Sequence, residues 1–214
     1  MNVKKPSVLS VVICLYTTLC VFYFLPFRLD HKIVLPLLLL SVAALRLQSL
    51  PMFCAMIFSA AGDYAGASHN FLVQMSAFAL AHISFIVYFS RIVLCGKHCY
   101  SVHSLVRFSL FASALFAIAV TVVLPSVKGM VITIGVAVYI VLIVLMFLLA
   151  GLTGLPAFQI GALLFVISDT ILGWNKFVDR IPYSSYWILI PYFSAQILLF
   201  VQAAILHRGR TVRK

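Results

Sequence analysis

The chain has 214 residues, of which 64% are hydrophobic and only 9% are charged, and its mean hydropathy is +1.19. Soluble domains carry roughly 25% charged residues, so this chain has too few to cover a surface that faces water. The composition excludes a soluble enzyme and a disordered chain. It indicates an all-α integral membrane protein, in which residues 1–214 form a single polytopic membrane domain.

The charge is strongly positive, because 15 Lys and Arg residues against four acidic residues give a formal net charge of +11. In a soluble protein this balance would point to nucleic acid. Here the basic residues lie mostly between or beyond apolar runs, where they orient helices and meet anionic lipid headgroups. We therefore expect membrane lipids, and no nucleic acid, as partners.

A transmembrane helix needs about 20 predominantly apolar residues. Runs of this kind predict a bundle of about eight transmembrane helices, at residues 7–25, 33–50, 52–68, 71–94, 104–124, 129–150, 155–173 and 184–206. Arg46 falls near the end of the second run and must reach the membrane interface. The first run lacks a small-x-small cleavage site, so we interpret it as a helix that is not removed as a signal peptide.

The orientation follows from the Lys and Arg residues in the connections. With eight spans and the N-terminus inside, ten of these residues fall on the inner side and five on the outer side. Positive charge concentrates on the cytoplasmic side of membrane proteins, so both termini are expected in the cytoplasm. The short loops and the lack of a targeting signal favour a bacterial inner membrane.

All four acidic residues are Asp, and Asp63 and Asp169 fall in the outward halves of the third and seventh predicted spans. A charge at this depth costs at least about 2.5–3.5 kcal/mol, so its presence indicates a function. The alternative is a helix cap or a hydrogen bond that joins helices. Two carboxyl groups in one site of low dielectric constant would differ in protonation, which would make an acid/base pair.

The surroundings of these two residues resemble each other. The first copy reads Phe58-Ser-Ala-Ala-Gly-Asp63 and then Phe78-Ala-Leu-Ala-His82-Ile, and the second reads Phe165-Val-Ile-Ser-Asp169 and then Tyr192-Phe-Ser-Ala-Gln196-Ile. The copies stand four spans apart, which favours a parallel 4+4 internal repeat. Such a repeat would gather both acids, His82 and Gln196 around one centre.

Other polar residues of these spans each allow two interpretations. His82, in the middle of the fourth span, either takes part in catalysis or forms a hydrogen bond between helices. Tyr192 and Gln196 share one helix face and either line a polar cavity or join helices. Asn175 and Lys176, after the seventh span, either bind a phosphate at headgroup level or belong to a solvated basic loop.

One loop contains a cluster of possible metal ligands, Cys95, His98, Cys99 and His103. Its spacing, Cys-x2-His-Cys-x3-His, matches no structural zinc pattern. The sequence also contains no Gly-rich phosphate loop and no nucleophile elbow, and nothing around Ser168 makes it the serine of a catalytic triad. We expect neither a metal nor a cofactor.

Several of these motifs together resemble the YhhN family, eight-span membrane proteins that include the lysoplasmalogenases. The resemblance covers about residues 30–206 and rests on Gly62-Asp63, Ala77-Phe-Ala-Leu-Ala-His82-Ile83, Gly161-Ala-Leu-Leu-Phe-Val-Ile-Ser-Asp169, Asn175-Lys-Phe177 and Tyr192-x-x-Ala195-Gln196. The chain departs from the family pattern after Asp63, at Tyr64-Ala-Gly-Ala-Ser, and at Gln74-Met75. These departures concern the shape of the substrate more than the acid pair.

The resemblance implies hydrolysis of the vinyl ether bond of a lysoplasmalogen, an alkenyl-glycerophosphocholine or -ethanolamine, to a fatty aldehyde and a glycerophospho-alcohol. The substrate is then a lysophospholipid. The expected catalytic residues are Asp63, Asp169 and His82, with the two Asp residues as general acid and base. The expected substrate-binding residues are Ser168, Asn175, Lys176, Tyr192 and Gln196.

Three other functions fit a bundle with buried acids. A proton-coupled transporter of a small molecule or lipid is the first, although the spans with the acids lack the paired Gly/Pro interruptions of broken helices. A hydrolase of another lysolipid is the second. A lipid-binding or scaffold protein without turnover is the third, and it would tolerate Asp63→Asn and Asp169→Asn.

Overall fold

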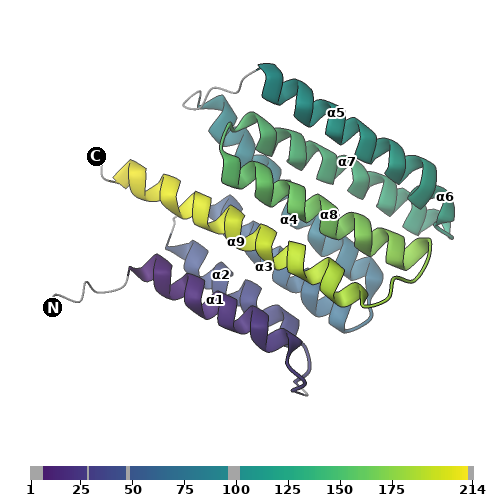
Figure 1. Cartoon of the computed structure of the whole chain (residues 1–214), viewed down its shortest axis with the longest axis horizontal. Helices are drawn as coiled ribbons and strands as arrows, with labels where there is room; N and C mark the ends of the chain where they lie inside the picture. Colours follow the sequence, from purple (N-terminus) through teal and green to yellow (C-terminus); the bar gives the residue numbers. More distant parts are fainter. Residues whose placement is uncertain (1–6, 28, 47–48, 96–101, 212–214) are drawn as a thin grey trace.

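The computed structural model of the chain describes residues 7–27, 29–46, 49–95 and 102–211, and within them it contains helices and short connections but no strand. Figure 1 shows the helices running roughly along one direction as a bundle. In chain order they are α1 (Val8–Phe24), the 3-10 turn η1 (Lys32–Val34), α2 (Leu35–Leu45), α3 (Leu50–Ala67), α4 (Phe71–Leu94), α5 (Val102–Ile118), the π-helix η2 (Ala119–Val123), α6 (Leu124–Ser126), α7 (Met130–Leu152), α8 (Pro156–Phe177) and α9 (Ser184–Thr211).

Local sequence signals explain where several of these helices begin. The side chains of Ser7 and Asn70 accept hydrogen bonds from backbone N–H groups in the first turns of α1 and α4, which satisfies donors that a helix leaves free. Helices α2, α3, α6 and α8 each have a proline in the first turn, where its missing N–H costs nothing. Between α3 and α4, His69 adopts a left-handed backbone conformation with φ of 58°, which allows a tight reversal.

Each of the eight predicted runs coincides with a helical segment, but among the described residues only five segments are long and apolar enough to cross a membrane by length and composition. These are Phe71–Leu94, Leu105–Ser126, Met130–Leu152, Pro156–Phe177 and Ser184–Gly209. The segments Val8–Phe24 and Lys32–Leu45 are apolar but shorter. Helix α3 has 18 residues, and Asp63 with two glycines and a proline makes it less apolar.

Near Arg46 and Lys176 the helices end at residues other than the ends of the predicted runs. Helix α2 ends at Leu45, and Arg46 forms its C-cap rather than lying inside a span. Helix α8 continues to Phe177, so Asn175 and Lys176 lie in its last turn and not in a loop after it. Lys176 in this last turn is a cation that interacts favourably with the helix dipole.

The packing brings the two halves of the chain together. Helix α3 lies along α4, α8 lies along α9, and α7 packs against α4, α5 and α8. Helix α1 contacts α2 and α9. In Figure 1 the start of α1 and the end of α9 lie at the same end of the bundle.

Aromatic side chains form a continuous core between α4, α8 and α9. Phe85, Phe89, Phe158 and Phe165 are fully buried, and the Phe89 ring lies 5.1 Å from that of Phe158 while the Phe165 ring lies 5.6 Å from that of Tyr192, in edge contacts. Aromatic pairs prefer such edge contacts. This core fixes the three helices relative to one another at the depth where the buried polar residues lie.

Candidate active site

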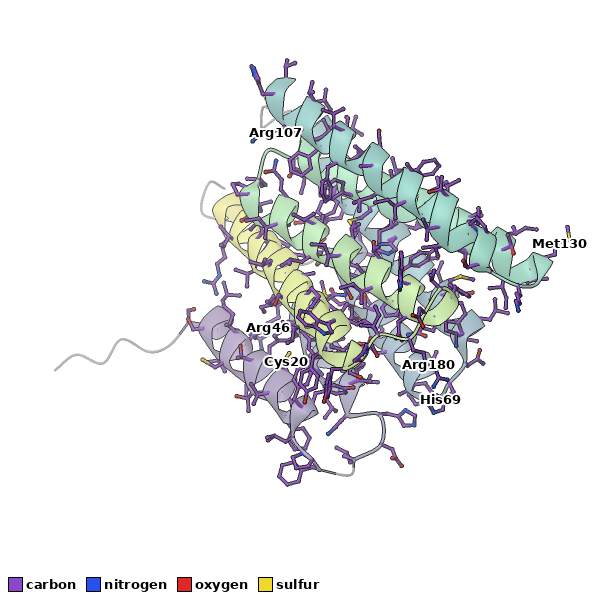
Figure 2. All side chains as sticks on the ribbon, turned by 45° about the vertical axis from the view of Figure 1, so that its right-hand side comes forward. Cys20, Arg46, His69, Arg107, Met130 and Arg180 are labelled. Carbon is purple, nitrogen blue, oxygen red and sulfur yellow. The ribbon has the colours of Figure 1, made fainter. Side chains whose placement is uncertain are left out.

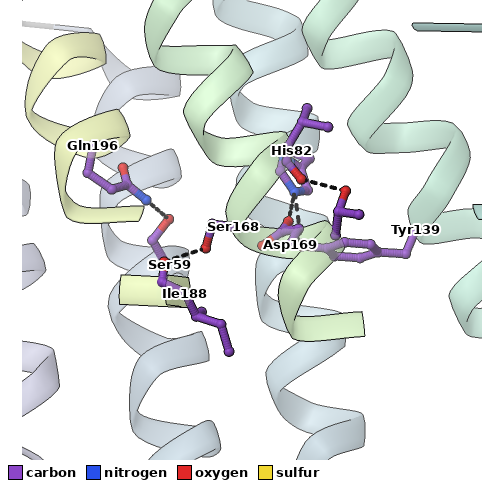
Figure 3. A network of polar contacts seen from close by, with 9 residues as sticks. Ser59, His82, Tyr139, Ser168, Asp169, Ile188 and Gln196 are labelled. Carbon is purple, nitrogen blue, oxygen red and sulfur yellow. Dashed lines mark hydrogen bonds and ion pairs between the residues drawn. The ribbon is translucent and has the colours of Figure 1, made fainter. Parts of the chain in front are cut away.

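Asp169, on α8, is held by side chains from two other helices. The Tyr139 hydroxyl, on α7, donates a hydrogen bond to Asp169 Oδ2 at 2.5 Å. His82 Nε2, on α4, lies 3.3 Å from the same oxygen and 3.0 Å from the Tyr139 hydroxyl oxygen. Figure 3 shows these three side chains converging from separate helices. The two contacts with Asp169 reach the same carboxyl oxygen, Oδ2.

His82 is fully buried, and its surroundings indicate which nitrogen carries the proton. The ring lies in edge contact with Phe165, with centroids 5.0 Å apart. Its Nδ1 is buried without a hydrogen-bond partner, and an N–H there would be costly because no acceptor meets it. We therefore place a ring proton on Nε2, from which it donates toward the Asp169–Tyr139 pair.

Asp63, on α3, is 3% exposed and meets a different helix. Its Oδ2 accepts a hydrogen bond of 3.0 Å from the Tyr192 hydroxyl of α9. One turn away on each helix, before Asp63 and after Tyr192, Gln196 Nε2 donates to Ser59 Oγ at 3.0 Å. Figure 3 shows this pair apart from the Asp169 group. Two polar links therefore join α3 to α9.

Both acids line one polar chamber of about 400 Å³. Its other walls come from α4, the start of α9 and the segment around His69, and they include Gln74, Ser184 and Ser185. In Figure 2, His69 and Arg180 lie at the end of the bundle opposite Arg46 and Arg107. The chamber therefore lies toward the end of the bundle away from the start of α1 and the end of α9.

The structure places five of the eight predicted site residues on the wall of this chamber: Asp63, Ser168, Asp169, Asn175 and Tyr192. His82 contacts Asp169 without being on that wall, and Gln196 lies one turn beyond Tyr192. Lys176 is also not on the wall, and its Nζ lies 5.1 Å from the centre of the Phe71 ring.

Tyr139 is the residue that sequence reasoning missed. It lies within α7, a helix of 23 residues whose other members are almost all aliphatic, so its aromatic ring suggested only packing against lipid or core. A usable signal was present, because a hydroxyl in the middle of such a run needs a partner when it is buried. The partner in the structure is Asp169.

Ser168 forms a hydrogen bond to α9 close to a proline of that helix. Its hydroxyl donates to the backbone carbonyl of Ile188 at 2.8 Å. Pro191 lies inside α9, and a proline disrupts the hydrogen bonds of the preceding turn, which Ser and Thr side chains of neighbouring helices can replace. The bond thus joins α8 to α9 beside Asp169 and Tyr192.

Ser168→Ala is expected to lower stability by about 1 kcal/mol, because the half-buried Ile188 carbonyl loses this donor. The measurement is the thermal unfolding midpoint in detergent. Ser76→Ala is the matched control, since its exposed hydroxyl bonds only within its own helix and its loss should leave the midpoint unchanged. An unchanged midpoint for Ser168→Ala, with a raised KM, would instead favour the substrate contact that the sequence predicted.

The metal-like loop lies partly outside the described residues, which include neither His98 nor Cys99. Among the residues that are described, no three His, Cys, Asp or Glu side chains are grouped so that they could hold a metal ion.

The sequence of the chain matches one protein family over most of its length. The model of the YhhN family matches residues 27–203 of the chain. The chain belongs to the YhhN family. A segment of 39 residues in this YhhN protein is 46% identical to the lysoplasmalogenase TMEM86B of Sus scrofa, and it covers 18% of this chain and 17% of that protein. No solved structure matches the chain.

Proposed function

We propose that this YhhN protein is a membrane hydrolase that cleaves the vinyl ether bond of lysoplasmalogens. The observation that carries the proposal is the chamber itself, where two carboxyl groups from opposite halves of the chain face one cavity with different hydrogen-bond partners. The family and the short match to a lysoplasmalogenase support the reaction class.

The two acids take different roles because their partners differ. Asp169 is held by two side chains close to one oxygen, Tyr139 and His82, which keep its carboxyl group oriented toward the chamber for accepting a proton. Asp63 is more buried and has one donor, Tyr192, and within the described residues no basic side chain forms an ion pair with it. We therefore assign Asp169 as the carboxylate and Asp63 as the protonated acid.

Vinyl ether hydrolysis begins with protonation of carbon. Asp63 gives its proton to the β-carbon, the electrons of the double bond form the new C–H bond, and an oxocarbenium ion and the Asp63 carboxylate result. Asp169 stabilises this cation electrostatically. Water then attacks the cation while Asp169 accepts its proton, which gives a hemiacetal. In the collapse Asp169 returns the proton to the leaving alcohol and Asp63 recovers one from the hemiacetal hydroxyl, so one water is consumed.

Tyr139 and His82 act as positioning residues in this mechanism, since they contact Asp169 rather than substrate. Tyr139→Phe removes a hydrogen bond to a charged group, worth about 1.5–3 kcal/mol, so kcat should fall by about 10- to 100-fold with little change in KM. Tyr183→Phe, at an exposed position, is the control. A normal kcat in Tyr139→Phe, measured by steady-state kinetics in detergent, would remove the assigned role.

The polar end of the substrate would occupy the chamber. Asn175 lines it, and its side-chain oxygen already accepts a bond from the Ile181 N–H at 2.8 Å, so its amide nitrogen remains to donate to a phosphate. Gln196 supports the site through Ser59, and Lys176 reaches the phosphate by leaving the ring of Phe71. Ser168 and Tyr192 contribute hydroxyl oxygens to the wall.

We also propose that all eight helical segments cross a bacterial inner membrane as a duplicated 4+4 bundle with both termini in the cytoplasm. The start of α1 and the end of α9 lie at one end of the bundle. The corresponding aromatic residues of the two copies, Phe78 and Tyr192, contact each other with ring centres 5.9 Å apart. Each acid is contacted by the other copy's polar helix, since Tyr192 meets Asp63 and His82 meets Asp169.

The proposal is tested by aldehyde release from purified protein in detergent. The panel contains 1-alkenyl-lysophosphatidylethanolamine, the choline equivalent, and the 1-alkyl and 1-acyl analogues. Aldehyde from both alkenyl lipids and no turnover of the alkyl analogue is expected, because only a vinyl ether can be protonated on carbon. Release of fatty acid from the acyl lipid alone would indicate a different lysolipid hydrolase, and proton-driven uptake of intact lipid into proteoliposomes without turnover would indicate a transporter.

A further inference from the structure

A second cavity adjoins the polar chamber, and its character is the opposite. It measures about 100 Å³ and lies between α4, α5 with η2, α7 and α8. Its wall is mostly aliphatic and aromatic, with Leu115, Val136 and Ile140 among its members. We call it the apolar groove.

The apolar groove and the polar chamber share part of their walls. Gln74, Phe78, Asp169 and Leu172 line both cavities. Asp169 therefore stands at the boundary between a polar and an apolar compartment. An amphiphile bound across this boundary would place the junction of its two parts beside the Asp169 carboxyl group.

We propose that the apolar groove binds the aliphatic chain of the lipid substrate, and that Ala119 and Gly173 determine how much chain it accepts. The inference rests on the proposed function and specifies which part of the substrate lies where. In a 1-alkenyl lysolipid the vinyl ether joins the chain to the glycerol, so a chain in the groove and a headgroup in the chamber bring the reacting carbons to Asp169.

The local structure of the groove supports this assignment. The π-helix η2 contributes Ala119 and Val123 to the wall, and short π-helical segments are frequent at functional sites because they redirect side chains. Thr170, one of the few polar members of the wall, already donates to the Val166 carbonyl at 2.7 Å. A polar ligand would thus find few free partners in the groove, whereas a hydrocarbon would need none.

Small residues keep the groove open. A Cβ atom added at Gly173 would lie 3.7 Å from Val123 Cγ1, an ordinary contact, so Gly173→Ala should be tolerated. A longer side chain at this position would extend into the groove. Ala119 lies on the neighbouring wall that η2 contributes, and a larger residue there would also fill space in the groove.

The first test measures kcat/KM for alkenyl lysolipids with chains of about 8 and about 18 carbons. Gly173→Leu should reduce the ratio of long-chain to short-chain kcat/KM at least about tenfold, since mismatches of shape in apolar pockets give discrimination of this order. Ala119→Phe should lower the same ratio. The test therefore still applies if one of the two variants fails to fold. Gly209→Leu, where nothing lies within 4 Å, should leave the ratio unchanged.

The second test does not depend on turnover. A 1-alkyl lysophosphatidylethanolamine with a diazirine in the chain is bound to the wild-type protein, irradiated, and the labelled residues are mapped by mass spectrometry. Labels on Ile140, Ile143 or Leu115 are expected. Labels confined to the lipid-facing residues Val131, Val138 and Val141 of α7 would overturn the inference.

Failure of the groove assignment and failure of the proposed hydrolysis give different results in these tests. Suppose that the wild-type protein releases aldehyde, but that the folded variants Gly173→Leu and Ala119→Phe keep the wild-type ratio of long-chain to short-chain kcat/KM. This result would contradict the groove assignment alone. A wild-type protein that releases no aldehyde at either length but carries labels in the groove would contradict the reaction and retain the chain site.

Discussion

Asp169→Asn is expected to reduce kcat for aldehyde release by about 10³-fold, within the range that positioned acid/base groups contribute. The Asn side chain keeps the shape and can still accept from Tyr139, but it can neither take a proton from water nor stabilise the oxocarbenium ion by its charge. Binding involves the headgroup and the chain, so KM should change little. Steady-state kinetics of the purified variant give both constants.

The matched control for this variant is Asp30→Asn, which changes an exposed carboxylate outside the chamber. It should retain wild-type kinetics. If Asp169→Asn kept more than about a tenth of the wild-type kcat with the same unfolding midpoint, Asp169 would not be the base of the reaction.

Asp63→Asn is expected to reduce kcat by a similar factor for a different reason. The amide cannot deliver a proton to carbon, and that step precedes all others. The reductions in kcat caused by the two substitutions should not multiply, because the effects of residues that act as a unit in one mechanism are grossly non-additive. The double variant should therefore be about as slow as either single variant, whereas independent roles would give a product near 10⁶.

Stability distinguishes the chemical role of Asp63 from a structural one. Among the described residues its hydrogen-bond donor is Tyr192, and Asn can accept the same bond, so Asp63→Asn should keep the unfolding midpoint. Asp179→Asn, which changes an acid in the exposed connection before α9, is the control. Full activity in a folded Asp63→Asn protein would show that the carboxyl group only joins α3 to α9.

The helical class of the fold could be predicted from sequence because it depends on composition and on the length of apolar runs. Each run became a helical segment, but the number of segments able to span a membrane by themselves could not be predicted in the same way. Helix α3 shows why: Asp63, Gly62 and Gly66 lower its apolar character while its partners in the bundle bury it. The end of α8 was missed because the helix does not stop where the apolar residues do.

The expectation that Asp63 and Asp169 come together in the bundle also came from sequence, and the two line one chamber. Their partners did not follow, since sequence proximity pairs each acid with the next helix, whereas the structure pairs Asp63 with Tyr192 and Asp169 with His82 across the two halves. Tyr139 could not be recognised as a partner because nothing in its own segment marks it. Ser168 illustrates the reverse case, where a polar residue beside the acid forms a bond that supports a proline-containing helix.

The most direct measurement is hydrolysis of 1-alkenyl-lysophosphatidylethanolamine by the wild-type protein in D₂O. The aldehyde is reduced as it forms by an added NADH-dependent dehydrogenase, so that later exchange is suppressed. If Asp63 protonates the β-carbon, mass spectrometry will find one deuterium on the carbon next to the former aldehyde group. Aldehyde without that deuterium, or intact lipid after incubation with folded protein, would contradict hydrolysis by the acid pair.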